Sequence, residues 1–176
     1  MNDTTWEQRF RGTYDRGLAA WRAGRRSPAE MFGPDDAAFL AGLGCSPREV
    51  FDFVEDFLDY NEPDFATALR ITAVRRDYFL RVQDGKPTGH TPPASDLPAK
   101  SDAVDGIPWL PRLIAKARLK LRGELPDELM YGCGGDRPFL RRMGTDLPSF
   151  LELVRDSGDD DRRIVDAVKQ TAGLSS

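Results

Sequence analysis

Two stretches of this chain match each other at a constant offset of about 100 residues, and this match constrains the fold more than any other feature. Identical residues recur in one register without a gap: Asp36, Phe39, Leu40, Gly44, Val54 and Asp56 as Asp136, Phe139, Leu140, Gly144, Val154 and Asp156. Apolar positions between them also match. The pattern predicts an ancient duplication that produced two similar halves.

The capping residues, prolines and glycines of both stretches are typical of helix ends. Ser46-Pro47-Arg48-Glu49 forms an S-x-x-E capping box with proline at the first helical position, and Asp146-Leu147-Pro148 supplies a cap and an early proline at the matching place. Gly44 and Gly144 are expected to end the preceding short helices in the left-handed conformation. Each half should therefore contain a short helix, a glycine stop and a capped second helix.

Longer helices follow from hydrophobic periodicity. A stripe at three- and four-residue steps predicts a first helix whose apolar side joins the core: Trp6, Phe10, Tyr14, Leu18 and Trp21. A second such pattern runs from Phe65 to Leu80, after the start signal Asn61-Glu62-Pro63. No comparable alternating β pattern appears, so we predict an all-α fold.

The stretch from Asp84 to Asp105 is rich in proline and polar residues and shows neither a helical nor a strand period. It is typical of a linker or a long surface loop. We therefore predict an N-terminal helical half at residues 1–83, a connecting segment at 84–106 and a C-terminal helical half at 107–176. The halves should pack their apolar stripes into one compact domain.

Composition narrows the function classes. The chain has 176 residues, of which 40% are hydrophobic and 31% charged, and it carries a formal net charge of -4. This balance is typical of a folded globular protein, and it argues against a protein that coats nucleic acid or an acidic membrane. We find neither a signal peptide nor a spanning segment, so a cytoplasmic location is expected.

Residues with reactive or metal-binding side chains are scarce. Two distant cysteines, Cys45 and Cys133, and a single histidine, His90 in the connecting segment, assemble neither a disulfide framework nor a usual zinc site. A histidine-dependent triad is improbable for the same reason. We expect no cofactor and no metal, and an enzyme is disfavoured because no set of residues fills the catalytic roles.

The segment from Ile107 to about Val168 resembles a bacterial family known as domain of unknown function 5069. The resemblance is carried by Leu110 to Arg118, Gly123, Tyr131, Asp136, Phe139-Leu140, Gly144, Phe150 and the acidic run Asp159-Asp160-Asp161. It implies an all-helical fold and no established activity. Ala115 departs from the family, which usually has aspartate there, and we expect Asp15 to be the counterpart of that aspartate in the first half.

The helix after Trp109 carries the clearest charge pattern. Arg112, Lys116 and Lys120 line the side opposite to its apolar face, and Arg118 and Arg122 flank them. One interpretation is a solvated basic face without a ligand. The other is a docking surface for an acidic partner or a phosphorylated ligand.

Two further clusters could belong to a site. The turn from Tyr131 to Asp136 contains three glycines, and it is either a structural turn with Asp136 as the N-cap or an anion-binding turn before a helix. Arg75 and Arg76 lie towards the end of a long helix, where cations either compensate the helix dipole or contact a ligand.

The leading hypothesis is a non-catalytic binding module that recognises an anionic small molecule or an acidic protein. Its candidate ligand-binding residues are Arg112, Lys116, Lys120, Arg75, Arg76, Tyr131 and Asp136. The alternative is a small enzyme or small-molecule binder whose pocket lies between the halves, near Tyr131, Cys133 and Asp136. The sequence does not indicate the oligomeric state.

Overall fold

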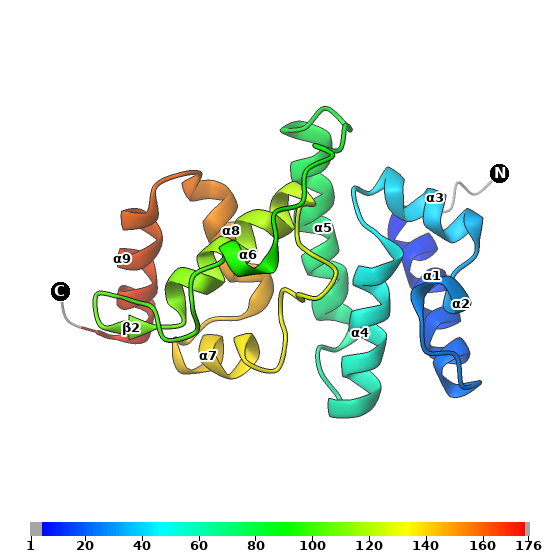
Figure 1. Ribbon diagram of the computed structural model, residues 1–176, viewed down its shortest axis with the longest axis horizontal. Helices are drawn as coiled ribbons and strands as arrows, with labels where there is room; N and C mark the ends of the chain where they lie inside the picture. Colours follow the sequence, from blue (N-terminus) through cyan, green and yellow to red (C-terminus); the bar gives the residue numbers. More distant parts are fainter. Residues whose placement is uncertain (1–4, 175–176) are drawn as a thin grey trace.

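The computed structural model describes residues 5–174 and is mostly helical (Figure 1). The N-terminal helices are α1 (Trp6–Arg22), α2 (Pro28–Met31), α3 (Pro34–Gly42), α4 (Pro47–Tyr60) and α5 (Phe65–Arg81). A short 3₁₀ helix, η1 (Ala94–Asp96), and two strands, β1 (Ala103–Val104) and β2 (Ile107–Pro108), follow. The C-terminal helices are α6 (Leu110–Arg122), α7 (Asp136–Arg142), α8 (Leu147–Ser157) and α9 (Asp161–Ala172).

The predicted helix signals are confirmed. Ser46 caps α4 in a capping box with Glu49, and Asp146 accepts a hydrogen bond from the amide of Ser149 at the start of α8. Gly44 and Gly144 have φ angles of 74° and 72°, which glycine adopts at little steric cost. Local capping chemistry therefore sets where these helices begin and end.

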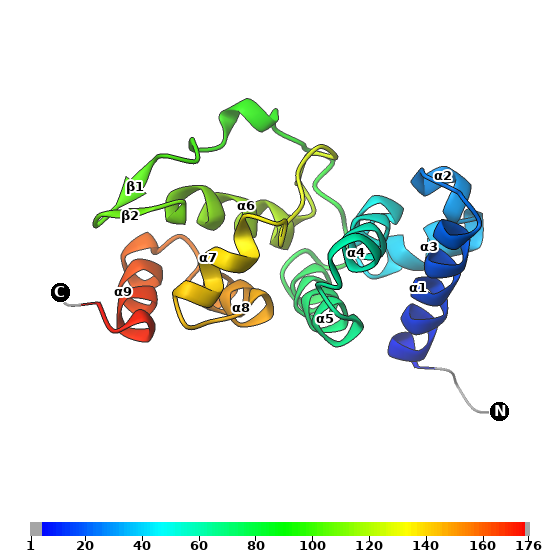
Figure 2. The ribbon, with the colours of Figure 1, turned by 90° about the horizontal axis from the view of Figure 1, so that it is seen from below.

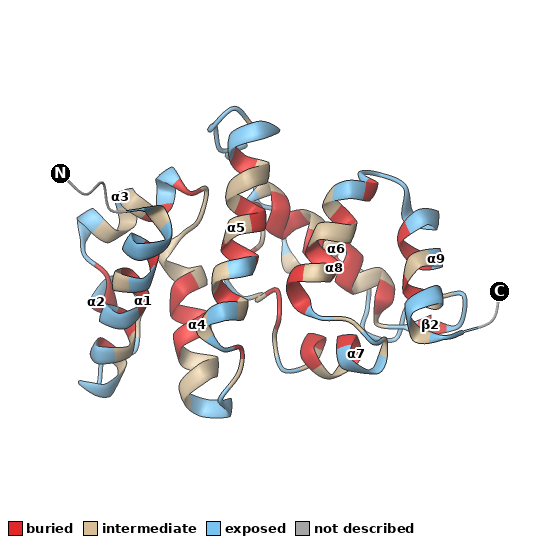
Figure 3. Ribbon diagram, turned by 180° about the vertical axis from the view of Figure 1, so that it is seen from behind, coloured by how far each residue is buried: buried red, intermediate tan, exposed pale blue. Residues whose placement is uncertain are grey.

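The helices are arranged along one long axis, with α1 and α9 at its two ends and α5 near the middle (Figures 1 and 2). Helix α1 packs on α4, whereas α5 packs on both α6 and α8 of the C-terminal half. Buried residues from both halves form a single hydrophobic cluster, which follows α4, α5, α6 and α8 through the centre (Figure 3). The two halves thus share one core.

The connecting segment has more structure than its composition predicts. Strands β1 and β2 form an antiparallel hairpin in which Ala103 pairs with Pro108 and Val104 with Ile107. Asp105 and Gly106 supply the two positive φ angles of a tight hairpin turn. The Asp105 carboxylate also contacts Arg162 and Lys169 of α9 at 2.7 and 3.0 Å. The fold is therefore mainly, but not entirely, α-helical.

Candidate functional site

Helix α6 does not present the exposed basic face that its sequence predicts. Lys116 and Lys120 are each only 3% exposed. The Lys116 ammonium pairs with Asp136, and the Lys120 ammonium pairs with Glu49 of α4. The prediction was wrong on this point because α6 lies between other elements, and both lysines reach carboxylates that are distant in the sequence.

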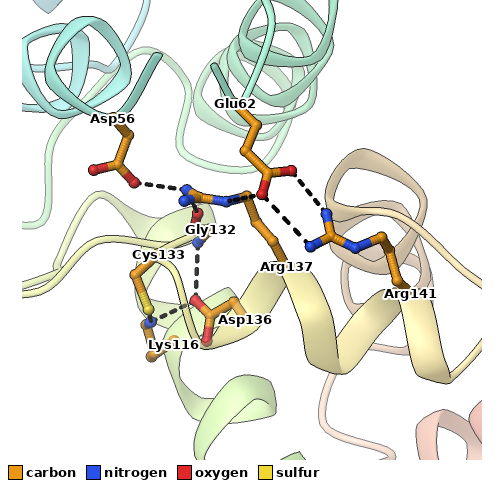
Figure 4. Close-up of polar contacts among 8 residues, drawn as sticks. All are labelled: Asp56, Glu62, Lys116, Gly132, Cys133, Asp136, Arg137 and Arg141. Carbon is orange, nitrogen blue, oxygen red and sulfur yellow. Dashed lines mark hydrogen bonds and ion pairs between the residues drawn. The ribbon is translucent and has the colours of Figure 1, made fainter. Parts of the chain in front are cut away.

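Lys116 and Asp136 form the centre of a buried polar cluster (Figure 4). Asp136 is fully buried, and its carboxylate accepts hydrogen bonds from Lys116 Nζ at 2.5 Å, the Gly132 amide at 2.9 Å and Trp109 Nε1 at 3.0 Å. The Cys133 thiol lies 3.4 Å from the same ammonium. Since both carboxylate oxygens have donors, this cluster holds the turn before α7 in place.

The glycine-rich turn is shaped by this cluster. Asp136 is the first residue of α7 and not its N-cap, because its side chain is turned inward towards Lys116. Gly135 takes the cap position, where an added Cβ would lie 2.4 Å from the Trp109 ring. The Tyr131 hydroxyl donates to the Leu147 carbonyl at 2.6 Å, and burial raises the pKa of this phenol. These contacts favour the structural interpretation of the turn.

A groove separates α4 from the C-terminal segment 123–137. Its smaller part, here called the Arg75 pocket, has a volume of about 290 Å³ and is lined by Arg75, Lys120, Gly44, Gly123 and residues around them. Its larger part, the acidic pocket, has a volume of about 580 Å³, and its lining includes six carboxylate residues: Asp52, Glu55, Asp56, Glu62, Asp127 and Glu128. The two pockets adjoin because they share four lining residues: Arg48, Asp52, Asp127 and Leu129.

Arg75 is the most deeply buried cation of the groove, with 1% of its surface exposed. Its Nε donates to the Gly44 carbonyl at 2.7 Å, and its Nη1 donates to the Leu121 carbonyl and to Gln83 Oε1, both at 2.6 Å. No carboxylate within residues 5–174 forms an ion pair with it. Desolvation lowers the pKa of this guanidinium, which nevertheless stays protonated at any physiological pH.

The Nη2 atom of Arg75 has no hydrogen-bond partner in the described part of the chain. It lies between two glycines that line the Arg75 pocket. A Cβ on Gly123 would approach Nη2 to 2.4 Å, and a Cβ on Gly44 would approach it to 2.9 Å. Both glycines have positive φ angles and end helical segments, and the absence of a Cβ at each position leaves room for Nη2.

Ion pairs in and beside the acidic pocket join the halves. Arg137 of α7 contacts Asp56 of α4 at 2.6 Å, and Arg141 contacts Glu62 at 2.7 Å (Figure 4). Asp52 pairs with Arg48 at 2.9 Å on the boundary between the two pockets. Burial raises the pKa of Asp52 to about 7, although Arg48 opposes this shift.

The structure brings only some of the predicted site residues together. Arg75 and Lys120 line the Arg75 pocket, and Cys133 lines the acidic pocket. The others lie outside the groove: Lys116, Tyr131 and Asp136 in the buried cluster, Arg112 on the carbonyl of Pro98, and Arg76 against the ring of Trp6. Sequence reasoning missed Arg48, Asp52 and Gly123, whose roles depend on the packing of distant helices.

Residues 5–174 contain no group of three or more histidine, cysteine, aspartate or glutamate side chains placed to hold a metal ion. Within the same residues, no helix is both long and apolar enough to cross a bilayer.

Comparison with known proteins finds a match between the C-terminal part of this chain and a family model. Neither the curated proteins nor the solved structures contain a match to this chain. The matched region begins before the hairpin and includes all four C-terminal helices, so it extends beyond the segment that carries the sequence resemblance. Residues 94–175 match the model of a family described as Domain of unknown function (DUF5069).

Proposed function

We propose that this protein binds a small molecule in the groove between its halves and that Arg75 receives an anionic group of this molecule. The observation that carries the proposal is the burial of Arg75 without a carboxylate partner. It is a nearly fully buried guanidinium that lines a pocket, donates only to neutral acceptors and has no carboxylate partner in residues 5–174.

The charge of Arg75 is only partly compensated by its surroundings. The Leu121 carbonyl belongs to the last turn of α6, and the Gly44 carbonyl follows α3, so both carry the negative end of a helical segment. Partial charges of this kind do not neutralise a full positive charge in a desolvated site. An anion at Nη2 would supply the missing compensation and a charge-assisted hydrogen bond.

The other two cations that line the Arg75 pocket each lie beside a carboxylate. Lys120 pairs with Glu49, and Arg48 pairs with Asp52. Glu49 balances the charge of Lys120, whereas Arg75 has no carboxylate partner in residues 5–174 and is therefore the cation that we assign to the anion. This site replaces the basic face of α6 in the proposal, because Lys116 and Lys120 are buried in ion pairs.

A binding role is favoured over a catalytic one by the groups in the groove. Burial raises the pKa of the Cys45 thiol to about 12, so this thiol stays protonated and is a poor nucleophile near neutral pH. The carboxyl of Asp52, with a pKa of about 7, is suited to acid–base chemistry, but its ion-pair partner among the described residues is Arg48 and not a nucleophile.

Ligand-dependent thermal melting tests the proposal, with phosphate, sulfate, acetate and succinate as probes at constant ionic strength. Because a ligand stabilises the state that binds it, at least one anion should raise the melting temperature in a saturable manner. Ala41 provides the variants, since it is exposed on α3 and lines the Arg75 pocket.

At this position Ala41→Glu adds a negative charge, Ala41→Lys adds a positive charge, and Ala41→Gln is the neutral control of similar size. All three residues are good helix formers. We expect the anion to bind A41E about threefold more weakly, and A41K more tightly, than A41Q. Equal affinities for the three variants, or no stabilising anion, would contradict the proposal.

We also infer that the two halves arose by duplication, as their sequences predict. An ion pair recurs at the same offset: Arg16 with Asp36 in the first half and Lys116 with Asp136 in the second. The amides of Cys45 and Thr145 donate to the carbonyls of Leu40 and Leu140 after the matching short helices. This shared geometry supports the inference, and the groove then lies at the junction between two copies.

A further inference from the structure

We propose that the ligand of the groove is dipolar, with its anionic group at Arg75 and a cationic amine in the adjoining acidic pocket. This inference rests on the proposed function, because it assigns the second end of the same ligand. It commits to a class of small molecule in which a carboxylate or phosphate and an amine are separated by a short carbon chain.

The acidic pocket has an excess of negative charge. Its lining contains six carboxylates and two guanidiniums. Asp52, Asp56 and Glu62 form ion pairs with arginines. The other three, Glu55, Asp127 and Glu128, have no ion-pair partner among the described residues. Three unpaired carboxylates on one concave surface favour a cation there.

The buried Arg75 beside the acidic pocket distinguishes this groove from an ordinary solvated acidic surface. A buried guanidinium with an unused Nη2 lies in one pocket, and three unpaired carboxylates line the pocket next to it. Opposite charges in adjoining pockets orient a dipolar molecule and disfavour one that carries only negative charge. The groove is therefore polarised along its length.

The two pockets are continuous through residues that they share. Leu129 contributes an apolar side chain to both, while Phe79 and Leu125 line the Arg75 pocket. An aliphatic chain that joins the anion to the amine would lie along these side chains, where its burial is favourable. Asp127 also lines both pockets, so the amine would meet a carboxylate where the acidic pocket begins.

Tyr60 adds an aromatic surface for the amine. It is 67% exposed at the end of α4, although large aromatic residues are usually more buried, and it lines the acidic pocket. An aromatic ring beside carboxylates is a common arrangement for binding an ammonium group. Tyr60, Asp127 and Glu128 are thus the residues that we assign to the cationic end.

The test compares amine-bearing probes with their amine-free counterparts: 4-aminobutyrate with butyrate, and 6-aminohexanoate with hexanoate. Binding to the full chain is measured by titration calorimetry and thermal melting. For at least one pair, the amine-bearing probe should bind about fivefold more tightly than its counterpart.

The double variant D127N/E128Q should remove this advantage and leave the binding of butyrate or hexanoate unchanged or stronger. Both residues are exposed in a loop, so the variant should fold. D96N/D159N is the matched control, because it removes two exposed carboxylates outside the groove. The control should keep the advantage of the amine.

The outcomes separate the two proposals. If each pair of probes binds equally well and A41E still weakens binding, the dipolar ligand is wrong and the anion site stands. If the advantage of the amine persists in D127N/E128Q, the assignment of the cationic end is wrong. If no probe binds, both proposals fail.

Discussion

Lys116 and Arg75 are both almost completely buried, but their surroundings differ. Lys116 meets a carboxylate that also receives donors from Trp109 and Gly132, so its cluster is complete within the chain. Arg75 meets two carbonyls and an amide oxygen, its Nη2 has no hydrogen-bond partner in residues 5–174, and the residue lines a pocket. A complete buried cluster supports the fold, whereas an incomplete one at a pocket indicates a site for a ligand.

The first prediction tests the structural side of this comparison. Lys116→Met leaves the Asp136 carboxylate buried without its cation, so the free energy of unfolding should fall by about 3–5 kcal/mol. Denaturant titration followed by circular dichroism measures this change. The double variant K116M/D136L should lose much less than the two single variants together, and additive losses would show that the pair is not coupled.

The second prediction concerns Arg75. Arg75→Met removes three hydrogen bonds but leaves no opposite charge unpaired, so we expect a smaller loss of about 2–3 kcal/mol. The stabilising effect of the anion should disappear in R75M and persist in K116M at a temperature where both are folded. A normal anion response in R75M would remove the functional difference between the two cations.

The raised pKa of Asp52, at the boundary of the two pockets, predicts how the stability of the protein depends on pH. Its pKa is about 7 in the folded protein and near the ordinary 3.8 in the unfolded chain. Between pH 4 and 7 the folded state therefore binds more protons, so its stability falls as the pH rises through this window. Asp52→Asn removes this dependence and should be more stable than the parent at pH 8 by about 1–2 kcal/mol.

Urea titrations of both proteins at several pH values measure the difference. It should grow from pH 4 to pH 7 and then level off. The loss of the contact with Arg48 offsets part of the gain. A difference that stays constant with pH would show that Asp52 has an ordinary pKa in the folded protein.

The sequence predicted the parts of the fold that depend on local chemistry. Ser46, Asp146 and Gly44 mark helix ends because capping needs only neighbouring residues. The stripe from Trp6 to Trp21 was correctly assigned to the core: Phe10 and Tyr14 are buried, and the other members are partly buried against the core cluster. The hairpin at 103–108 was missed because it is only two residues long on each side and is held by α9.

The candidate site was less predictable because its contacts span large sequence separations. Lys120 pairs with Glu49, 71 residues away, and Arg75 contacts Leu121, 46 residues away. Charge periodicity on one helix cannot reveal such partners, so both cations resembled surface residues. Arg75 does lie beside the ends of helical segments, but these belong to α6 and α3 and not to its own helix.

The last prediction compares the matching ion pairs of the two halves and has the smallest expected effect. Arg16 is largely exposed where its counterpart Lys116 is buried, and Asp36 also receives a hydrogen bond from Thr13 at 3.2 Å. Arg16→Met should lower the free energy of unfolding by less than about 1 kcal/mol, since exposed pairs are screened by water and salt. The effect should shrink further at high salt. A loss as large as that of K116M would mean that this pair, despite its exposure, supports the N-terminal half as Lys116 and Asp136 support the other.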